Sequence, residues 1–157
     1  MSKAYEQALE EAYKDNVNKP LVVSLLNQAL DENSAEAAYA LATWYLHGEY
    51  FDKDYVKAAS LLQKAAAQNY PDACFDLAIC YETGQGTELN LQKAFFLYVK
   101  AALYGNLQSI QEVGRCYEYG IGVEENADLA QIWYEKAESV GIEMEYEDDE
   151  LDSDKGN

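Results

Sequence analysis

The sequence has little basic charge, a single histidine and no long hydrophobic run. Its longest apolar stretches are a few residues, whereas a membrane-spanning helix needs about 20. Residues 1–14, MSKAYEQALEEAYK, lack the hydrophobic segment and the small-residue cleavage site of a secretory signal. We therefore expect neither a membrane span nor an export signal, and we predict a cytoplasmic location.

Acidic residues outnumber basic ones, 29 to 11, so the chain has a formal net charge of −18. The excess is spread along the chain: residues 143–155 carry a net charge of −7, and residues 1–141 carry −11. Such a charge repels nucleic acid and anionic membranes. It attracts and steers a basic protein instead. The charge predicts a basic protein partner, with solubility alone as the alternative.

Catalytic and metal-binding motifs are missing as well. The histidine, His47, stands beside a glycine, and no serine or cysteine lies in a recognisable nucleophile motif. The carboxylates of residues 147–149 lack the glycine and ligand spacing of a calcium loop. Gly84–Gly86 and Gly120–Gly122 lack the preceding strand and the following Lys-Ser/Thr of a phosphate loop. We therefore predict no enzyme activity, no metal and no cofactor.

A segment that runs from Ala35 to Tyr70 recurs as residues 71–106 and again from residue 107, with a period of 36 residues. Four sets of identical residues mark the same points of each copy. They are Gly48, Gly84 and Gly120; Tyr45, Tyr81 and Tyr117; Ala58, Ala94 and Ala130; and Lys64, Lys100 and Lys136. A fixed period of this length is typical of stacked supersecondary units. The lysines end the second helix of each unit, where a cation complements the helix dipole, and we prefer that role to phosphate binding.

Each copy has the pattern of two antiparallel helices. Ala37, Leu41 and Tyr45 stand at i, i+4 and i+8 and form one apolar helical face, so the three repeated tyrosines are assigned to the core. Gly48 suits the end of that helix, and Asp54 suits the N-cap of the next. No segment alternates with the two-residue period of a strand, so the fold class is all-α.

The period extends backwards into residues 1–34, which we interpret as a degenerate capping repeat with helices near Lys3–Tyr13 and Pro20–Asp31. Three further repeats follow, and the charge density of the C-terminal residues predicts an acidic, partly disordered cap or tail. The predicted divisions are 1–34, 35–70, 71–106, 107–141 and 142–157.

The three cysteines are Cys74, Cys80 and Cys116, an odd number without a metal-binding C-x-x-C pair. Cys80 and Cys116 occupy the same repeat position, so a bridge between neighbouring helices is one interpretation. Buried free thiols in a reducing compartment are the favoured one.

These repeated residues resemble the Sel-one-like repeat, a relative of the tetratricopeptide repeat with a longer inter-helix loop. The resemblance rests on Ala35, Ala37, Tyr39, Leu41, Tyr45, Gly48, Asp54, Lys57, Ala58 and Lys64–Ala66, and on their counterparts in the next two copies. Tyr50 departs from the pattern, because it replaces the second loop glycine, so this loop must turn differently. The resemblance implies a right-handed α-α solenoid of about four antiparallel helix pairs that serves as a protein-interaction scaffold.

By analogy with the tetratricopeptide groove, five positions of the first helix in each unit line a concave surface. These positions are Glu36, Tyr39, Thr43, Leu46 and His47; Asp72, Phe75, Ile79, Glu82 and Thr83; and Gln108, Gln111, Arg115, Glu118 and Tyr119. Aromatic residues ringed by carboxylates suit a protein or peptide partner that carries Lys or Arg. For Tyr39 and Phe75, a purely structural role is the alternative.

The sequence therefore predicts an acidic protein-interaction module. The sharpest hypothesis is an inhibitor or immunity protein that neutralises a basic toxin by covering it, because the repeat body is itself acidic. A regulatory adaptor that holds a peptide segment in its concave groove is the alternative. An enzyme is the least favoured function.

Overall fold

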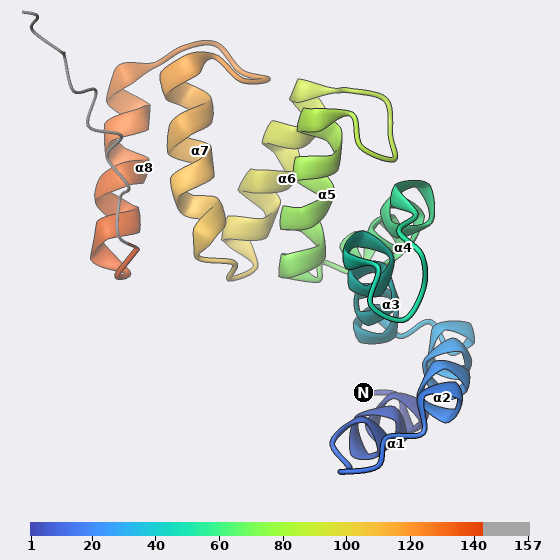
Figure 1. Ribbon diagram of the computed structural model, residues 1–157. Helices are drawn as coiled ribbons and strands as arrows, with labels where there is room; N and C mark the ends of the chain where they lie inside the picture. Colours follow the sequence, from blue (N-terminus) through green and yellow to red (C-terminus); the bar gives the residue numbers. More distant parts are fainter. Residues whose placement is uncertain (143–157) are drawn as a thin grey trace, which may run out of the picture.

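The computed structural model describes residues 1–142, and this part of the chain contains eight helices and no strand. The helices are α1 (Lys3–Ala12), α2 (Lys19–Asp31), α3 (Ala35–His47), α4 (Tyr55–Ala67), α5 (Pro71–Thr83), α6 (Leu91–Leu103), α7 (Gln108–Tyr119) and α8 (Ala127–Ser139). They form four antiparallel pairs that follow one another along an arc (Figure 1). The predicted solenoid of helix pairs is confirmed. The predicted C-terminal tail lies outside the described residues from position 143 onwards.

The same capping chemistry recurs in every pair. Each second helix follows an Asn or Asp whose side chain accepts a hydrogen bond from the backbone N–H three residues later. These N-caps are Asn18, Asp54, Asn90 and Asn126. Helices α3, α5 and α7 each end at a glycine in the left-handed conformation. The predicted helix end at Gly48 and the predicted cap at Asp54 are therefore confirmed.

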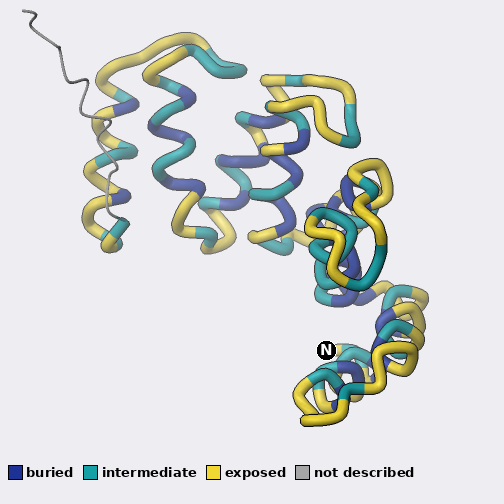
Figure 2. The backbone as a smooth tube through the Cα atoms, in the orientation of Figure 1, coloured by how far each residue is buried: buried dark blue, intermediate teal, exposed yellow. Residues whose placement is uncertain are grey.

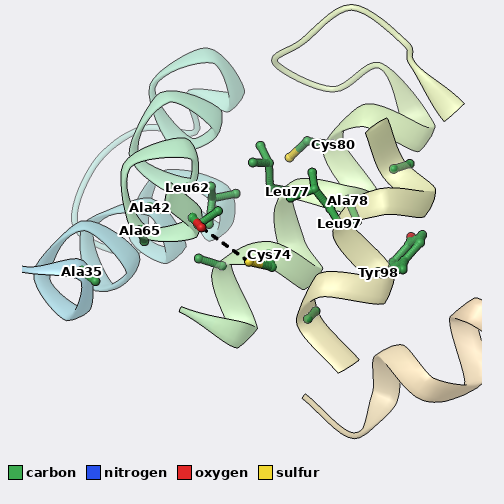
Figure 3. Close-up of a cluster of buried hydrophobic side chains, with 14 of the residues drawn as sticks. Ala35, Ala42, Leu62, Ala65, Cys74, Leu77, Ala78, Cys80, Leu97 and Tyr98 are labelled. Carbon is green, nitrogen blue, oxygen red and sulfur yellow. Dashed lines mark hydrogen bonds between the residues drawn. The ribbon is translucent and has the colours of Figure 1, made fainter. Parts of the chain in front are cut away.

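The core is built largely from alanine on the facing sides of the helices, and buried residues run along the whole row of pairs (Figure 2). Small side chains let antiparallel helices approach closely, and larger residues such as Leu62, Leu77 and Tyr98 fill the remaining space (Figure 3). The buried residues form two clusters, one from α1 to α3 and one from α3 to α7. Leu30 and Leu61 pack against both clusters, so the core is continuous between the first two pairs.

The three cysteines are buried and free, so no bridge joins Cys80 to Cys116. Burial raises the pKa of the Cys116 thiol to about 12 and holds the pKa values of Cys74 and Cys80 above their usual range. Protonated buried thiols are poor nucleophiles, so these residues act as small core side chains.

Tyr45, Tyr81 and Tyr117 are all half-buried. Tyr81 and Tyr117 pack against the buried core as predicted, whereas Tyr45 stacks on Phe51 of the following loop. The Nζ atom of Lys57 lies 5.4 Å from the ring centroid of Tyr45, and that of Lys93 lies 5.2 Å from the ring centroid of Tyr81. In these two pairs a lysine from the start of the second helix therefore covers the ring in a cation–π contact.

The lysines that end the second helices were assigned to helix-dipole complementation, and Lys100 shows a specific form of that role. Its Nζ donates a 2.7 Å hydrogen bond to the backbone carbonyl of Ala66, near the end of the preceding second helix, α4. The Ala66 carbonyl also accepts a 3.0 Å hydrogen bond from the backbone N–H of Asn69, so Lys100 adds a charged donor from the next pair to the C-terminal end of α4.

In the loops of the third and fourth pairs, the second glycine makes a close contact with the preceding pair. A Cβ on Gly86 would lie 2.0 Å from the backbone oxygen of Tyr55, and a Cβ on Gly122 would lie 2.0 Å from that of Leu91. Tyr55 and Leu91 are the first residues of α4 and α6. Each loop therefore packs its backbone directly on the helix start of the preceding pair, where only glycine fits.

Tyr50 holds the equivalent position in the loop after α3, and this loop does turn differently. Tyr50 is not among the residues with positive φ, whereas Gly86 and Gly122 are. Its ring stacks on Trp44 with 3.8 Å between ring centroids, and Lys19 Nζ lies 5.2 Å from it. Lys19 begins α2, so the aromatic ring meets the preceding helix start through a side chain instead of the backbone.

We predict that Gly86→Ala lowers the free energy of unfolding by about 3–4 kcal/mol and Gly84→Ala by only about 1–2 kcal/mol. Both glycines have φ near +72°, so the backbone strain of alanine is common to the two variants. A Cβ on Gly84 would have its nearest neighbour at 3.5 Å, an ordinary contact. Urea unfolding followed by circular dichroism measures both losses, and equal losses would contradict the packing of this loop on α4.

Candidate functional site

The fifteen predicted binding residues all lie on α3, α5 and α7, and none of them is fully buried. Two further carboxylates, Asp76 on α5 and Glu112 on α7, are half-buried and contact members of this set. We call the seventeen residues together the first-helix face. Three groups of side chains can be distinguished on it.

The first group lies near the N-terminal ends of α3 and α5. The Tyr39 hydroxyl lies close enough to the Asp76 carboxylate for each group to shift the pKa of the other, and the Tyr39 ring centroid lies 5.1 Å from that of Tyr70. Tyr5 of α1 and Glu36 of α3 lie close enough to influence the pKa of Tyr70. We call this group the acidic tyrosine cluster, and its members are Tyr5, Glu36, Tyr39, Tyr70, Asp72 and Asp76.

The acidic tyrosine cluster has a negative potential. Burial raises the pKa of Asp76, and the neighbouring Asp72 raises it further, while the Tyr39 hydroxyl and His47 oppose the shift. Burial followed by the charges of Asp76 and Asp72 raises the pKa of Tyr39. Within residues 1–142, no lysine or arginine forms an ion pair with Glu36, Asp72 or Asp76. Glu36 accepts a hydrogen bond from the Ser34 hydroxyl, and Asp72 accepts one from the side-chain amide of Asn106, both at 2.8 Å.

The second group is an ionic network that joins α5, α6 and α7. Arg115 Nη2 donates to Glu82 Oε2 at 2.8 Å, and Arg115 Nε donates to Glu112 Oε2 at 2.7 Å. The hydroxyl of the buried Tyr98 donates to the same Glu82 oxygen at 2.7 Å. Burial raises the pKa of Glu82, but the hydrogen bonds from Arg115 and Tyr98 outweigh it, so the pKa lies below its usual range. Arg115 is therefore held in place and neutralised by carboxylates of the face itself.

A tyrosine–glutamate hydrogen bond recurs in the last two pairs. Tyr134 donates to Glu118 on the fourth pair as Tyr98 donates to Glu82 on the third. In the second pair the same two positions are Leu46 and Leu62, so both members change together. The two glutamates are among the predicted binding residues, whereas their tyrosine partners are not. This paired change between copies is the signal that could have found them.

The third group is apolar and lies between the other two. Ile79 is exposed, whereas Leu46 and Phe75 are half-buried and pack against the core. The ring of Phe75 meets Tyr98 edge-on with 5.9 Å between centroids. Phe75 and Tyr39 therefore both have structural contacts and both keep part of their surface accessible.

The remaining predicted residues join none of these groups through a specific contact. Thr43 and Thr83 donate hydroxyl hydrogen bonds to carbonyls of their own helices. His47, Gln108 and Tyr119 are exposed, and Gln111 is half-buried.

Residues 1–142 contain no group of three or more His, Cys, Asp or Glu side chains placed to hold a metal ion. None of the helices described is long and apolar enough to cross a bilayer. The chemistry of the first-helix face is that of carboxylates, tyrosine hydroxyls and a few apolar side chains, which suits non-covalent recognition.

The pattern of the Sel1 repeat matches residues 35–70, 71–106 and 108–141. The chain belongs to the Sel1 repeat family. Sel1-repeat proteins generally mediate protein–protein interaction, and their fold is a protein-interaction scaffold. Among curated proteins, none matches this sequence.

Solved structures of Sel1-repeat proteins have the same fold. The antigen c5321 of uropathogenic Escherichia coli has a TM-score of 0.80 and 26% identity, over 88% of this chain and 30% of its own. A Sel1 repeat protein from Oxalobacter formigenes has a TM-score of 0.82 and 25% identity, over 88% and 59%. Cysteine rich protein B of Helicobacter pylori has a TM-score of 0.60 and 28% identity, over 65% and 77%. This chain thus spans less than two thirds of the length of the first two proteins.

We predict that Arg115→Gln lowers the free energy of unfolding by about 2 kcal/mol at pH 7, because Glu82 and Glu112 lose their shared cation. Arg115 keeps the pKa of Glu82 below the value of about 4.3 that glutamate has in an unfolded chain. The stabilisation by Arg115 is therefore complete above the pKa of the unfolded chain, and it is lost as the pH falls through the lower pKa of Glu82 in the folded protein. The free energies of unfolding of the wild type and Arg115→Gln should therefore become similar in acid.

Lys57→Gln is the matched control for this measurement. It removes a cation from a more exposed pair, in which Lys57 Nζ lies 3.7 Å from Asp54 Oδ2. Its cost should stay below about 1 kcal/mol. Urea unfolding between about pH 3 and pH 7 tests both variants, and a pH-independent loss in Arg115→Gln would contradict the ionic origin of the effect.

Proposed function

We propose that this protein binds a basic protein through the first-helix face, and that in its sharpest form it is an inhibitor or immunity protein that covers a toxin. The acidic tyrosine cluster is the observation that carries the proposal. It combines three tyrosines and three carboxylates from α1, α3, α5 and the connection after α4. Tyrosine rings and carboxylates together favour Lys or Arg side chains.

The net charge of the chain supports the same kind of partner. A charge of −18 steers a basic protein towards the surface and disfavours acidic ones. The ionic network already satisfies Arg115, so the one arginine of the chain does not oppose a basic partner with a free positive charge. The three free thiols fit a reducing compartment, and we place the interaction in the cytoplasm.

An adaptor that holds a peptide segment is the second candidate, and the exposed Ile79 favours it. Ile79 lies between the acidic tyrosine cluster and the ionic network, where it offers an apolar contact next to the carboxylates. A peptide with an apolar residue beside a Lys or Arg would match that order. The two candidates differ in whether a folded surface or a short segment is recognised.

We predict that Glu36→Gln combined with Asp72→Asn weakens binding at least about tenfold at low salt. The full-length protein is used as bait in an extract of the native cell, and the captured protein is then purified for calorimetry. Removal of two carboxylates should also reduce the dependence of affinity on salt concentration.

The matched control is Asp128→Asn combined with Glu135→Gln, which removes the same charge from exposed positions of α8. It should change affinity by less than about threefold. Equal losses of affinity in the two double variants would show that only the overall charge matters, and this would contradict binding through the first-helix face. An acidic or neutral partner, or binding that salt does not weaken, would contradict the proposal.

A measurement of the partner's own activity distinguishes an inhibitor from an adaptor. An inhibitor should abolish that activity at equimolar concentration, and short peptides of the partner should compete poorly. An adaptor should leave the activity unchanged, and one short peptide should displace the whole partner.

A further inference from the structure

The connection between α6 and α7 carries two exposed apolar side chains. Tyr104 is 52% exposed and Leu107 is 48% exposed, and they flank Gly105 and Asn106. Within residues 1–142, a Cβ added to Gly105 would meet nothing within 4 Å beyond its own chain neighbours, so the space over this connection is open. We call Tyr104 and Leu107 the apolar turn. Burial of such side chains against a partner is favourable.

Stacking of the helix pairs does not require apolar residues at these two positions. The same positions hold Glu32 and Ala35 before α3, and Gln68 and Pro71 before α5. The backbone N–H groups of residues 34, 70 and 106 each donate to the carbonyl oxygen five residues earlier, so all three connections close in the same way. The apolar turn is therefore a local feature of this chain.

Asn106 places the apolar turn beside the acidic tyrosine cluster. Its side-chain amide donates a 2.8 Å hydrogen bond to Asp72 Oδ1 at the start of α5. Its Oδ1 accepts a 2.9 Å hydrogen bond from the backbone N–H of Ser109, so the side chain is held on both sides. The connection from α6 to α7 accordingly lies next to the start of α5 (Figure 1). Asp72 and the apolar turn thus belong to one continuous surface.

The charges on this surface favour a basic occupant. Asp72 is exposed, and neither it nor Glu36 forms an ion pair with a lysine or arginine of residues 1–142. Lys100 is the basic residue nearest in sequence to the apolar turn, and its Nζ donates to the Ala66 carbonyl of α4. A cation of a partner can therefore approach Asp72 without displacing a lysine of this chain.

We propose that the acidic tyrosine cluster and the apolar turn bind one segment of a partner protein, in which an apolar residue stands within two residues of a Lys or Arg. The basic side chain meets Asp72 and the tyrosine rings, and the apolar side chain packs on Tyr104 and Leu107. Asn106 is a positioning residue, because it holds Asp72 next to the turn. The segment belongs to the basic partner of the proposed function, on which this inference rests.

The test selects short random peptides displayed on phage, with the full-length protein as bait, and measures the affinity of a selected peptide by fluorescence anisotropy. We expect a Lys or Arg within two residues of an apolar residue. The turn variant, Tyr104→Gln combined with Leu107→Ala, copies the residues at positions 68 and 35, so it keeps the net charge. It should bind the peptide at least about fivefold more weakly, with an unchanged melting temperature.

Two double-mutant cycles locate the two side chains of the peptide. Alanine in place of its apolar residue should cost at least about fivefold in the wild type and almost nothing in the turn variant. Glutamine in place of its Lys or Arg should show the same coupling with Glu36→Gln combined with Asp72→Asn. Additive losses in the first cycle would overturn the proposal.

The controls remove exposed apolar side chains outside the apolar turn. They are Ile79→Ser, at a position that is 36% exposed, and Val56→Ser combined with Leu89→Ser, at positions that are 69% and 62% exposed. Each should change affinity by less than about threefold. A loss in either control as large as that in the turn variant would contradict the proposal. A turn variant that binds normally, or a selection that yields no peptide, would contradict it as well.

The outcomes distinguish this site from the function on which it rests. Basic peptides that couple to Glu36 and Asp72 but not to the apolar turn would overturn the two-part site and leave the basic partner in place. Acidic or neutral peptides that couple to the apolar turn would instead overturn the basic partner itself. Sedimentation equilibrium should show a monomer, since each copy carries a net charge of −18. A dimer that the turn variant dissociates would overturn the proposal, because a second copy would then cover the turn.

Discussion

Close approach of the polypeptide backbone between helix pairs is the constraint on which this structure depends. The loops of the third and fourth pairs reach the starts of α4 and α6 only because Gly86 and Gly122 have no side chain. Inside the fourth pair, a Cβ on Gly114 would lie 2.7 Å from the ring of Tyr134. Alanine serves the same purpose along the helices. The period of the sequence is thus mainly a period of small residues.

A scaffold held by these small residues leaves the outer and inner faces free to vary between copies. The first-helix face changes from the apolar Leu46 and its partner Leu62 to the hydrogen-bonded Glu82 and Tyr98 without loss of the helix pair. The outer faces of the second helices vary as well, since α6 carries the exposed Phe96 and Leu103 where α4 carries Ser60 and Ala67. Both surfaces can therefore acquire specificity without changing how the pairs stack.

Several structural features could be predicted because they depend on local chemistry. Helix ends at glycine, N-caps at Asn or Asp, and apolar faces with helical spacing need only a few neighbouring residues. The position of Asp76 could not be found in this way. Asp76 belongs to the acidic tyrosine cluster because Tyr39 of the previous pair lies close to it, and that proximity depends on how neighbouring pairs pack.

The all-α repeat, its 36-residue period, the family and the acidic character of the chain could be read from the sequence, because each is a property of residue type and spacing. Which carboxylates are paired with a cation depends on the packing of the helix pairs. Glu82 and Glu112 share Arg115 across two helix pairs, whereas Asp72 and Asp76 lie near tyrosines and form no ion pair with a lysine or arginine of residues 1–142. The difference arises from packing, since a charge is neutralised only by groups that the fold brings within a few ångströms.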